Sequence, residues 1–250
     1  MALSISGWLR SSVRRLAESI YPPICAGCGA FSGRHGGLCG ACWSNMAWIE
    51  KPVCDVLGSP LPFEAGEGAL SADAIADPPP FAKARSAVLY DDVARSIVHR
   101  FKYKDRTDLA DMMARWMVRA GADLIAGTDV ILPVPLHRGR LLFRQFNQSA
   151  ELARAVARQT GLPYKPATLL RIRATRRQVG LGASARADNV RRAFSIPQKR
   201  RRDVKGKCVL LVDDVYTTGA TVKSAARELE RAGARKVFVL TFARVAPGYL

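Results

Sequence analysis

The sequence has no long apolar run. Its longest unbroken stretches, such as Val209 to Val212 and Val237 to Leu240, are far shorter than the roughly 20 residues that a helix needs to cross a bilayer. Residues 1–20 also lack the continuous apolar core of a secretory signal. We therefore expect no transmembrane helix, no export and a cytoplasmic location.

Residues 1–20 repeat their apolar positions at helical spacing, with arginines on the opposite side, so they predict an amphipathic helix. Such a helix fits an anionic membrane surface, but docking on its own protein is the simpler interpretation. The apolar positions are Ile5, Trp8, Leu9, Val13, Leu16 and Ile20, and the arginines are Arg10, Arg14 and Arg15.

Acidic residues are scarce, with 21 Asp and Glu against 39 Lys and Arg, which gives a formal net charge of +18. Residues 165–202 contain twelve basic residues and one acid, Asp188, so this segment alone carries +11. A cluster of this kind indicates a polyanionic partner, either a diphosphate substrate or a nucleic acid backbone or both, and a solvated loop is the alternative. Aromatic residues that stack on bases are nearly absent there, which argues against single-strand binding by this segment. The basic residues are Lys165, Arg171, Arg173, Arg176, Arg177, Arg186, Arg191, Arg192, Lys199, Arg200, Arg201 and Arg202.

The chain has only six cysteines, and four of them form two Cys-x-x-Cys pairs: Cys25, Cys28, Cys39 and Cys42. Disulfides and reactive dithiols are alternatives, but the spacing is typical of two zinc knuckles that close a tetrahedron of thiolates. Four thiolates leave no open coordination position, so we expect a structural zinc that replaces a missing core. Neither His35 nor His137 is needed to complete the four ligands. Cys208, inside a predicted strand, is most simply a core residue.

The chain divides by composition into four parts. We expect an amphipathic helix at 1–20, a zinc-ribbon-like module at 21–60, a linker at 61–84 and one main domain at 85–250. The linker is rich in Gly, Pro and Ala and ends at Asp77-Pro78-Pro79-Pro80, where proline resists both helix and central strand. We find no internal repeat.

The main domain alternates short apolar strands with amphipathic helices. This order predicts an α/β fold, with a parallel sheet covered by helices on both faces and ligands bound at the carboxyl ends of the strands. Strands are expected at Ala87 to Tyr90, Val130 to Leu136, Lys207 to Val212 and Val237 to Phe242, and helices at Val93 to Phe101, Leu109 to Ala120, Ser149 to Gln159 and Thr221 to Ala232.

One strand runs directly into two acids and a small-residue turn that opens a helix. A helix N-terminus offers unpaired backbone N–H groups and partial positive charge to a phosphate, and Gly219 lets the backbone approach the anion. Asp213 and Asp214 accept hydrogen bonds, which suits a vicinal diol, a hydrated magnesium ion or a cationic transition state. Helix capping is the structural alternative for the turn, which consists of Thr217, Thr218, Gly219, Ala220 and Thr221.

A second strand, Ile131 to Leu136, ends in a basic loop with Arg138, Arg140 and Arg144. Arginine offers planar bidentate donors to a diphosphate, so this loop is a candidate second anion site, with surface solvation as the alternative. The segment from Arg173 to Asn189 has no sustained period, and we expect a long loop that closes over bound substrate.

Val209 to Thr221 resembles the signature of type I phosphoribosyltransferases, an apolar strand followed by two acids and a Thr-Thr-Gly-x-Thr loop. The resemblance implies binding of 5-phosphoribosyl-1-pyrophosphate (PRPP) with magnesium. Asp213 and Asp214 would face the ribose hydroxyls as the candidate catalytic residues, and Thr217 to Thr221 would hold the 5′-phosphate.

From residue 20 to residue 245, the chain is similar to the ComF family of competence proteins, whose members join an N-terminal zinc ribbon to a phosphoribosyltransferase domain. A second ribbon often follows in that family, but here Cys54 stands alone, without a partner before Cys208. The further matching motifs are Pro133-Val134-Pro135, Arg144-Gln145-Phe146-Asn147-Gln148, Thr175-Arg176-Arg177-Gln178-Val179-Gly180-Leu181, Arg186 and Asn189-Val190.

Two functions remain open at this point. The first is transfer of phosphoribose from PRPP to an unidentified nitrogen acceptor. The second is nucleic-acid handling in DNA uptake, with single-stranded DNA or another nucleic acid as partner and the fold as a binding scaffold.

Overall fold

The computed structural model describes residues 22–33, 36–62, 66–103, 108–136, 146–172 and 193–246. The predicted N-terminal helix, both histidines considered as ligands and the predicted closing loop from Arg173 to Asn189 lie outside these residues. Among the described helices, none combines the length and the apolar composition that crossing a membrane requires.

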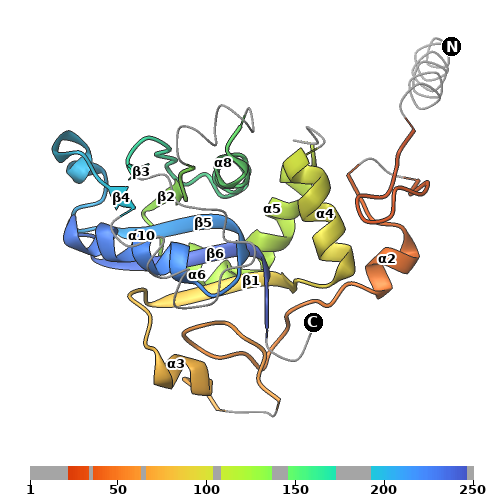
Figure 1. Cartoon of the computed structure of the whole chain (residues 1–250), viewed down its shortest axis with the longest axis horizontal. Coiled ribbons are helices and arrows are strands. Elements are labelled where there is room, and N and C mark those ends of the chain that lie inside the picture. The colour runs from red at the N-terminus through yellow and green to blue at the C-terminus, as the bar shows by residue number, and fades with distance from the viewer. Residues whose placement is uncertain are drawn as a thin grey trace, which may run out of the picture.

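A four-stranded parallel sheet forms the centre of the domain (Figure 1), with strand order β1-β6-β5-β2. The strands are β1 (Lys83–Leu89), β2 (Val130–Pro133), β5 (Cys208–Tyr216) and β6 (Lys236–Arg244). The two central strands pair in parallel from Cys208 with Lys236 to Tyr216 with Arg244. The predicted parallel sheet is confirmed.

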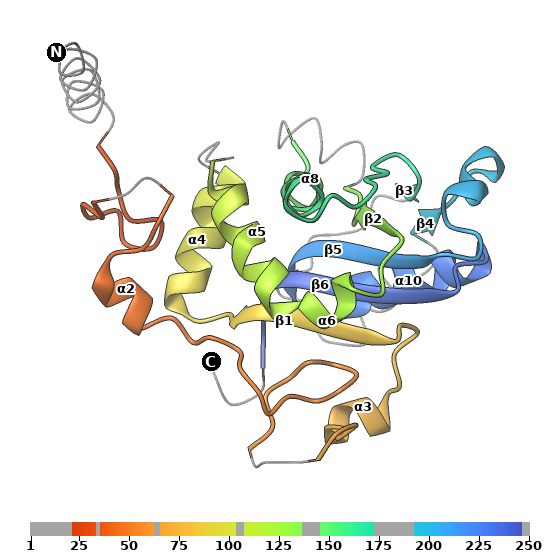
Figure 2. The ribbon, with the colours of Figure 1, turned by 180° about the vertical axis from the view of Figure 1, so that it is seen from behind.

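Helices cover both faces of the sheet, as the apolar strands require (Figures 1 and 2). One face packs against α4 (Asp92–Tyr103), α5 (Leu109–Ala120) and α8 (Gln148–Thr160), and the short α6 (Ala122–Ile125) follows α5. The opposite face packs against α10 (Ala220–Arg231).

Several strand boundaries differ from the sequence-based expectation. β1 begins at Lys83 and not at Ala87, and β6 ends at Arg244 and not at Phe242. β2 ends at Pro133 and not at Leu136, because Pro135 cannot donate a ladder hydrogen bond. β5 continues to Tyr216 and still pairs with β6 at Asp213, so the two acids belong to the strand itself. Their side chains are therefore held by the sheet and not by the following turn.

The remaining elements are short. They are α2 (Gly40–Ser44), α3 (Ala72–Ala76), the antiparallel pair β3 (Leu170–Arg171) and β4 (Phe194–Ser195), and the 3-10 helix η1 (Gln198–Asp203). The segment expected to be a linker contains α3, and it buries Ala74 and Phe81 in the core on the α10 face. These apolar side chains hold the segment against the domain despite the prolines between them.

Three tryptophans join the first cysteine module to the sheet. The ring centroids of Trp43 and Trp48 lie 4.6 Å apart, and Trp48 lies 5.0 Å from Trp116 on α5. Trp48 also forms a β-bridge to Val88 at the outer edge of β1. The module therefore packs on the rim of the sheet and covers part of its exposed edge.

Candidate functional site

The candidate site lies at the carboxyl edge of the sheet, where β2 and β5 end side by side. Their register pairs Pro133 with Val212, so the residues that follow each strand emerge together. Helix α8 begins at this edge, because Ser149 Oγ in its first turn lies 2.7 Å from a carboxylate oxygen of Asp213. Helix α10 begins there too, directly after the turn that follows β5.

Asp213 is the most perturbed acid of the site. Its Oδ1 accepts hydrogen bonds from Ser149 Oγ at 2.7 Å and from the backbone N–H of Asp214 at 2.9 Å. Burial and the neighbouring Asp214 carboxylate nevertheless raise the pKa of Asp213 to about 7. A carboxyl group held in this way exchanges its proton near neutral pH, which is typical of functional acids.

Asp214 forms an ion pair with Lys102 near the end of α4, and both side chains are largely buried. No motif in the sequence marks Lys102 or Ser149 as a site residue. Lys102 directly follows a helical apolar pattern, and the local pattern around Ser149 indicates only the start of a helix. Both reach the acids through tertiary packing, which no local sequence signal reports.

The turn from Thr217 to Thr221 connects the acids to α10. Gly219 is the N-cap residue, with a left-handed backbone (φ 74°), and a Cβ atom placed there would lie 2.3 Å from the Tyr216 hydroxyl. Only glycine fits both the conformation and the space. Thr218 Oγ1 is buried and has no hydrogen-bond partner among the described residues. A buried hydroxyl of this kind calls for a ligand or water, and a phosphate oxygen would satisfy it.

The three arginines predicted to form the second anion site, Arg138, Arg140 and Arg144, lie outside the described residues. The structure does describe both ends of their loop. At its exit, Asn147 caps α8 by accepting from the Ser149 N–H (3.1 Å), and its Nδ2 donates to the Val134 carbonyl oxygen (3.1 Å). Asn147 therefore ties the start of α8 to the end of β2.

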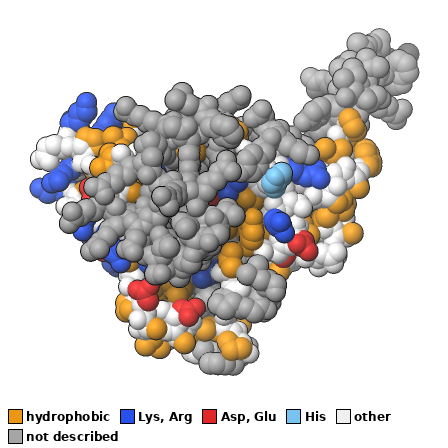
Figure 3. Space-filling view, viewed as in Figure 1, with side chains coloured by type: hydrophobic (Ala, Val, Ile, Leu, Met, Phe, Trp, Pro, Cys, Tyr) orange, Lys and Arg blue, Asp and Glu red, His pale blue; other side chains and the backbone are white. Residues whose placement is uncertain are grey.

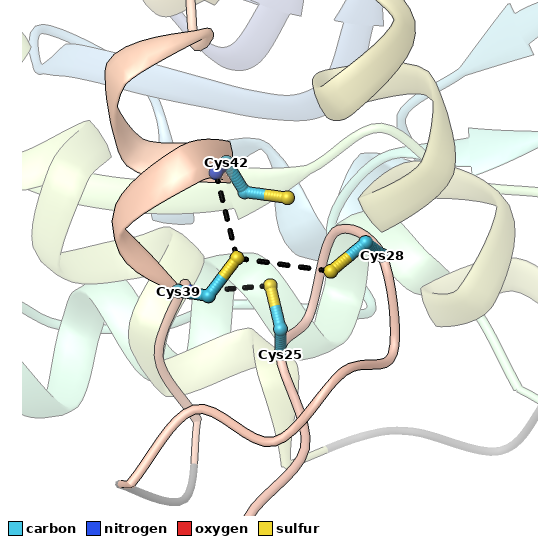
Figure 4. Close-up of side chains that lie close together, drawn as sticks. All are labelled: Cys25, Cys28, Cys39 and Cys42. Carbon is cyan, nitrogen blue, oxygen red and sulfur yellow. Dashed lines mark hydrogen bonds between the residues drawn. The ribbon is translucent and has the colours of Figure 1, made fainter.

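The four cysteine side chains of the first module converge (Figure 4), with all sulfur atoms within 4.8 Å of one another. A zinc–sulfur distance of about 2.3 Å places neighbouring sulfurs of a tetrahedron about 3.8 Å apart. The Sγ atoms of Cys28 and Cys39 are 3.7 Å apart, which fits. The residues present are therefore those of a structural zinc site.

The electrostatics of the cluster also call for a cation. Burial acts to raise the pKa of Cys25. Hydrogen bonds from backbone N–H groups, that of Cys39 above all, nevertheless lower this pKa to about 6. Burial and the neighbouring sulfur atoms raise the pKa of Cys42 to about 12. The four thiols cannot all ionise together unless a positive charge lies among them, and zinc supplies that charge.

We expect Cys28→Ser to abolish stoichiometric zinc binding, because a hydroxyl is a poor replacement for a thiolate ligand. Metal analysis of protein purified without chelators should find one zinc per chain in the wild type and well under half of that in the variant. Cys54→Ala, outside the cluster, is the matched control and should keep the full zinc content. Zinc-free wild-type protein would contradict this prediction.

The raised pKa of Asp213 predicts a pH-dependent stability of the ligand-free domain. The pKa of this carboxyl group is higher in the folded protein than its ordinary value of 3.8, so folding favours the protonated form. Its contribution to stability is thus complete below about pH 4 and is lost as the pH rises through about 7. Asp213→Asn stays neutral, so its melting temperature should rise relative to the wild type between pH 5 and pH 8 in magnesium-free buffer. Each kcal/mol corresponds to about 2–4 °C in a domain of this size. A constant difference across this range would contradict the assignment.

The exposed basic residues near β5 lie far from the candidate site. Lys199 to Arg202 form η1, which precedes the amino end of β5, and Lys and Arg side chains gather at this end of the molecule (Figure 3). Asp213 lies at the opposite end of the same strand. Arg171, also counted in the basic segment, is buried and lies 5.5 Å from the centre of the Phe194 ring. The six arginines between residues 173 and 192 lie outside the described residues.

Comparison with known families matches two parts of the chain. Residues 16–75 match a double zinc ribbon domain, and residues 147–249 match a phosphoribosyl transferase domain. The α/β fold of the phosphoribosyltransferase type and the N-terminal zinc ribbon, both predicted from the sequence, are confirmed.

Relatives match over most of the chain. A protein named DNA utilization protein YhgH from Salmonella typhi is 32% identical over 216 residues, which cover 84% of this chain and 91% of the relative. Competence protein ComFC from Bacillus subtilis is 25% identical over 213 residues, with 83% and 84% covered. A solved structure entitled "Structure of the allosteric regulatory enzyme of purine biosynthesis" is 24% identical with a TM-score of 0.40, and the match covers 57% of this chain and 29% of that one. By its relatives and its two matched domains, the chain belongs to the ComF family.

Proposed function

We propose that the domain binds PRPP with magnesium and transfers its phosphoribosyl group to a nitrogen acceptor. The observation that carries this proposal is the junction of β5 and α10, where an acid pair and a phosphate-type turn follow each other within nine residues, Asp213 to Thr221. A phosphorylated ribose combines a phosphate and a vicinal diol at the short separation that this junction offers. A plain phosphate would use only the turn.

Each part of the junction has a distinct role in this proposal. The backbone N–H groups at the start of α10, together with the buried Thr218 hydroxyl, bind the 5′-phosphate. Asp213, fixed by Ser149, and Asp214, next to Lys102, accept hydrogen bonds from the ribose hydroxyls or from water on magnesium. Lys102 balances part of the acid pair's charge, and its position at the site edge also suits an anionic ligand.

The reaction would be a displacement at the anomeric carbon. A nitrogen lone pair forms the new C–N bond while the C–O bond to pyrophosphate breaks, and the bonding electrons leave with the pyrophosphate. The acid pair stabilises the positive charge that develops on the ribose. Magnesium, when bound with the diphosphate, neutralises the leaving group. Arg138, Arg140 and Arg144 are the candidates for holding that diphosphate.

Titration calorimetry tests this proposal on the intact wild-type chain. We expect PRPP with magnesium to bind more tightly than ribose 5-phosphate, and ribose 5-phosphate more tightly than inorganic phosphate, because each step adds groups that the site can bind. Absence of PRPP binding at millimolar ligand would contradict the proposal.

We also propose a cytoplasmic location, because zinc thiolates persist in a reducing compartment.

A second candidate function is nucleic-acid handling, which the names of the relatives suggest. The observation that favours it is the basic cluster of η1, together with Lys205, Arg231, Arg235 and Lys236, which are all exposed. The Gly206 N–H donates to the Gly233 carbonyl oxygen at 2.7 Å, which holds together the two turns that carry these groups. Because the cluster lies at the opposite end of β5 from the acid pair, a phosphate backbone and PRPP would not compete for the same residues.

We expect charge reversal at Arg200, Arg201 and Arg202 to flatten the salt dependence of single-stranded DNA binding. Each lost phosphate contact lowers the slope of log affinity against log salt by about 0.7, so the triple variant should lose about 2. Arg95→Glu, on the distant α4, is the matched control. An unchanged slope in the triple variant would remove η1 from any nucleic-acid interface.

A further inference from the structure

The turn around Cys54 repeats the zinc-knuckle turn around Cys25. In each turn the cysteine N–H donates to the carbonyl oxygen five residues later, at 2.6 Å for Cys25 and 2.8 Å for Cys54. The N–H four residues later donates back to the cysteine carbonyl, at 3.0 and 2.8 Å. An antiparallel bridge flanks both turns. The chain therefore folds a second ribbon, described over residues 53–62 and 66–76, of the kind that the double zinc ribbon match covers.

The helix that completes each ribbon begins in the same way. Cys39 is the N-cap of α2 and its N–H donates to Cys25 Sγ at 3.2 Å. Ser71 is the N-cap of α3 and its N–H donates to Cys54 Sγ, also at 3.2 Å. The four ligand positions of the second ribbon are thus occupied by Cys54, Leu57, Ser71 and Ala74. One thiol with two apolar side chains does not fit a zinc ion.

Apolar packing takes the place of the second metal. Cys54, Leu57 and Ala74 are almost fully buried, and they belong to the same core as Phe81 and Tyr216. A ribbon of this size usually needs a metal because it has too little core of its own. Here the core is shared with the α10 face of the sheet.

The second ribbon contacts the residues behind the turn from Thr217 to Thr221, which is the phosphate turn of the proposed site. The Leu57 carbonyl oxygen accepts a hydrogen bond from the buried Arg244 guanidinium. That guanidinium lies over the Tyr216 ring, 5.0 Å from its centre. Phe81 packs edge-on against the same ring, with centroids 6.5 Å apart. The Tyr216 hydroxyl in turn fills the space beneath Gly219.

A second route reaches the phosphate turn through its helix. Asp77, directly after α3, forms an ion pair of 2.6 Å with Lys223 in the first turn of α10. The Lys223 N–H donates to the Gly219 carbonyl oxygen at 2.8 Å. Both routes end at Gly219, the one position of the proposed 5′-phosphate site where only glycine fits.

Arg244 is an unusual residue in this arrangement. It is 5% exposed, and none of the ion pairs between described residues includes it. Burying a cation is costly, and burial lowers the pKa of its guanidinium although the Asp73 carboxylate acts to raise it. The guanidinium also adds positive potential behind the turn, which favours an anionic ligand there.

We propose that the second ribbon is a metal-free brace that positions the phosphate turn through Arg244 and Tyr216. The inference rests on the proposed PRPP function for its ligand, but the brace itself concerns the geometry of residues 217–221. Arg244 and Tyr216 are positioning residues and do not touch the substrate.

Three variants test the brace in the full-length, zinc-loaded chain. Arg244→Met keeps the length of the side chain but removes its charge and its hydrogen bond to the ribbon. Arg244→Lys restores the charge and should rescue part of the effect. Asp77→Asn removes the ion pair with Lys223 at an exposed position. This variant still tests the brace if Arg244→Met does not fold.

The readouts separate positioning from general stability. We expect Arg244→Met to weaken ribose 5-phosphate about tenfold, as loss of one or two charge-assisted contacts would, and Asp77→Asn to weaken it less. Magnesium pyrophosphate, which does not use the turn, should bind the folded variants as it binds the wild type. Hydrogen exchange at residues 217–221 should accelerate in both variants. Zinc content should stay at one per chain, in Cys54→Ala as well.

The brace is overturned if folded variants leave both the ribose 5-phosphate affinity and the exchange at 217–221 unchanged. It is also overturned if wild-type protein holds two zinc ions and Cys54→Ala loses one. If wild-type protein binds no ribose 5-phosphate, the proposed function fails, whereas the exchange rates still decide the brace.

Discussion

Gly219→Val should reduce PRPP binding by about a hundredfold or more. The left-handed backbone at this position strains any β-branched residue, and the new Cβ would lie 2.3 Å from the Tyr216 hydroxyl. The turn must therefore move, and the backbone donors at the start of α10 move with it. Loss of two charge-assisted hydrogen bonds accounts for about 3 kcal/mol or more, which is the stated loss in affinity. Inorganic phosphate should be weakened as well.

Gly161→Val is the matched control for this experiment. Gly161 has nearly the same backbone conformation (φ 72°), but a Cβ atom there meets nothing within 4 Å, and the residue caps the far end of α8. The two variants thus share backbone strain and differ in location. Calorimetry should find normal PRPP affinity in Gly161→Val. Equal losses in both variants would mean that strain alone, and not the phosphate turn, causes the effect.

The double variant Asp213→Asn, Asp214→Asn should separate ribose recognition from phosphate recognition. It keeps the side-chain volumes and removes both charges, so the ribose hydroxyls and the magnesium-bound water lose their strong acceptors. PRPP should bind about 10–100-fold more weakly, whereas inorganic phosphate should bind as well as before or better. Competition titrations with the two ligands measure this difference.

Asp129→Asn is the control for the acid pair. Asp129 accepts from the Cys208 N–H at the amino end of β5, as far from the site as this strand allows, and asparagine can still accept that bond. Its PRPP affinity should match the wild type. If the double variant weakens inorganic phosphate as much as PRPP, the acids serve the phosphate turn and not the ribose.

The sequence predicts the sheet and the phosphate turn because both depend on local patterns. The run Cys208–Val212 is apolar on both faces, as a central parallel strand must be, and the structure buries all five residues. The turn from Thr217 to Thr221 is encoded by a glycine with left-handed backbone between small hydroxyl residues. Each Cys-x-x-Cys pair is a local motif, and the two pairs need only to meet each other to complete the cluster of four sulfur atoms.

Features that depend on tertiary packing could not be predicted in this way. Lys102 and Ser149 meet the acids only when α4 and α8 pack on the sheet. Only one of the four ligand positions of the second ribbon is a cysteine, so its sequence does not carry the Cys-x-x-Cys spacing that identifies a ribbon. The charge of residues 165–202 gave no indication that Lys199 to Arg202 lie at the opposite end of β5 from the acids.

The most direct test of the account is an experimental structure of the wild-type protein with magnesium and PRPP. We expect the 5′-phosphate on the backbone N–H groups of residues 217–221, with the Thr218 hydroxyl as a donor. We also expect the ribose hydroxyls, or magnesium-bound water, within hydrogen-bonding distance of Asp213 and Asp214. PRPP bound at the basic cluster of η1, or a phosphate turn left empty at saturating ligand, would contradict it.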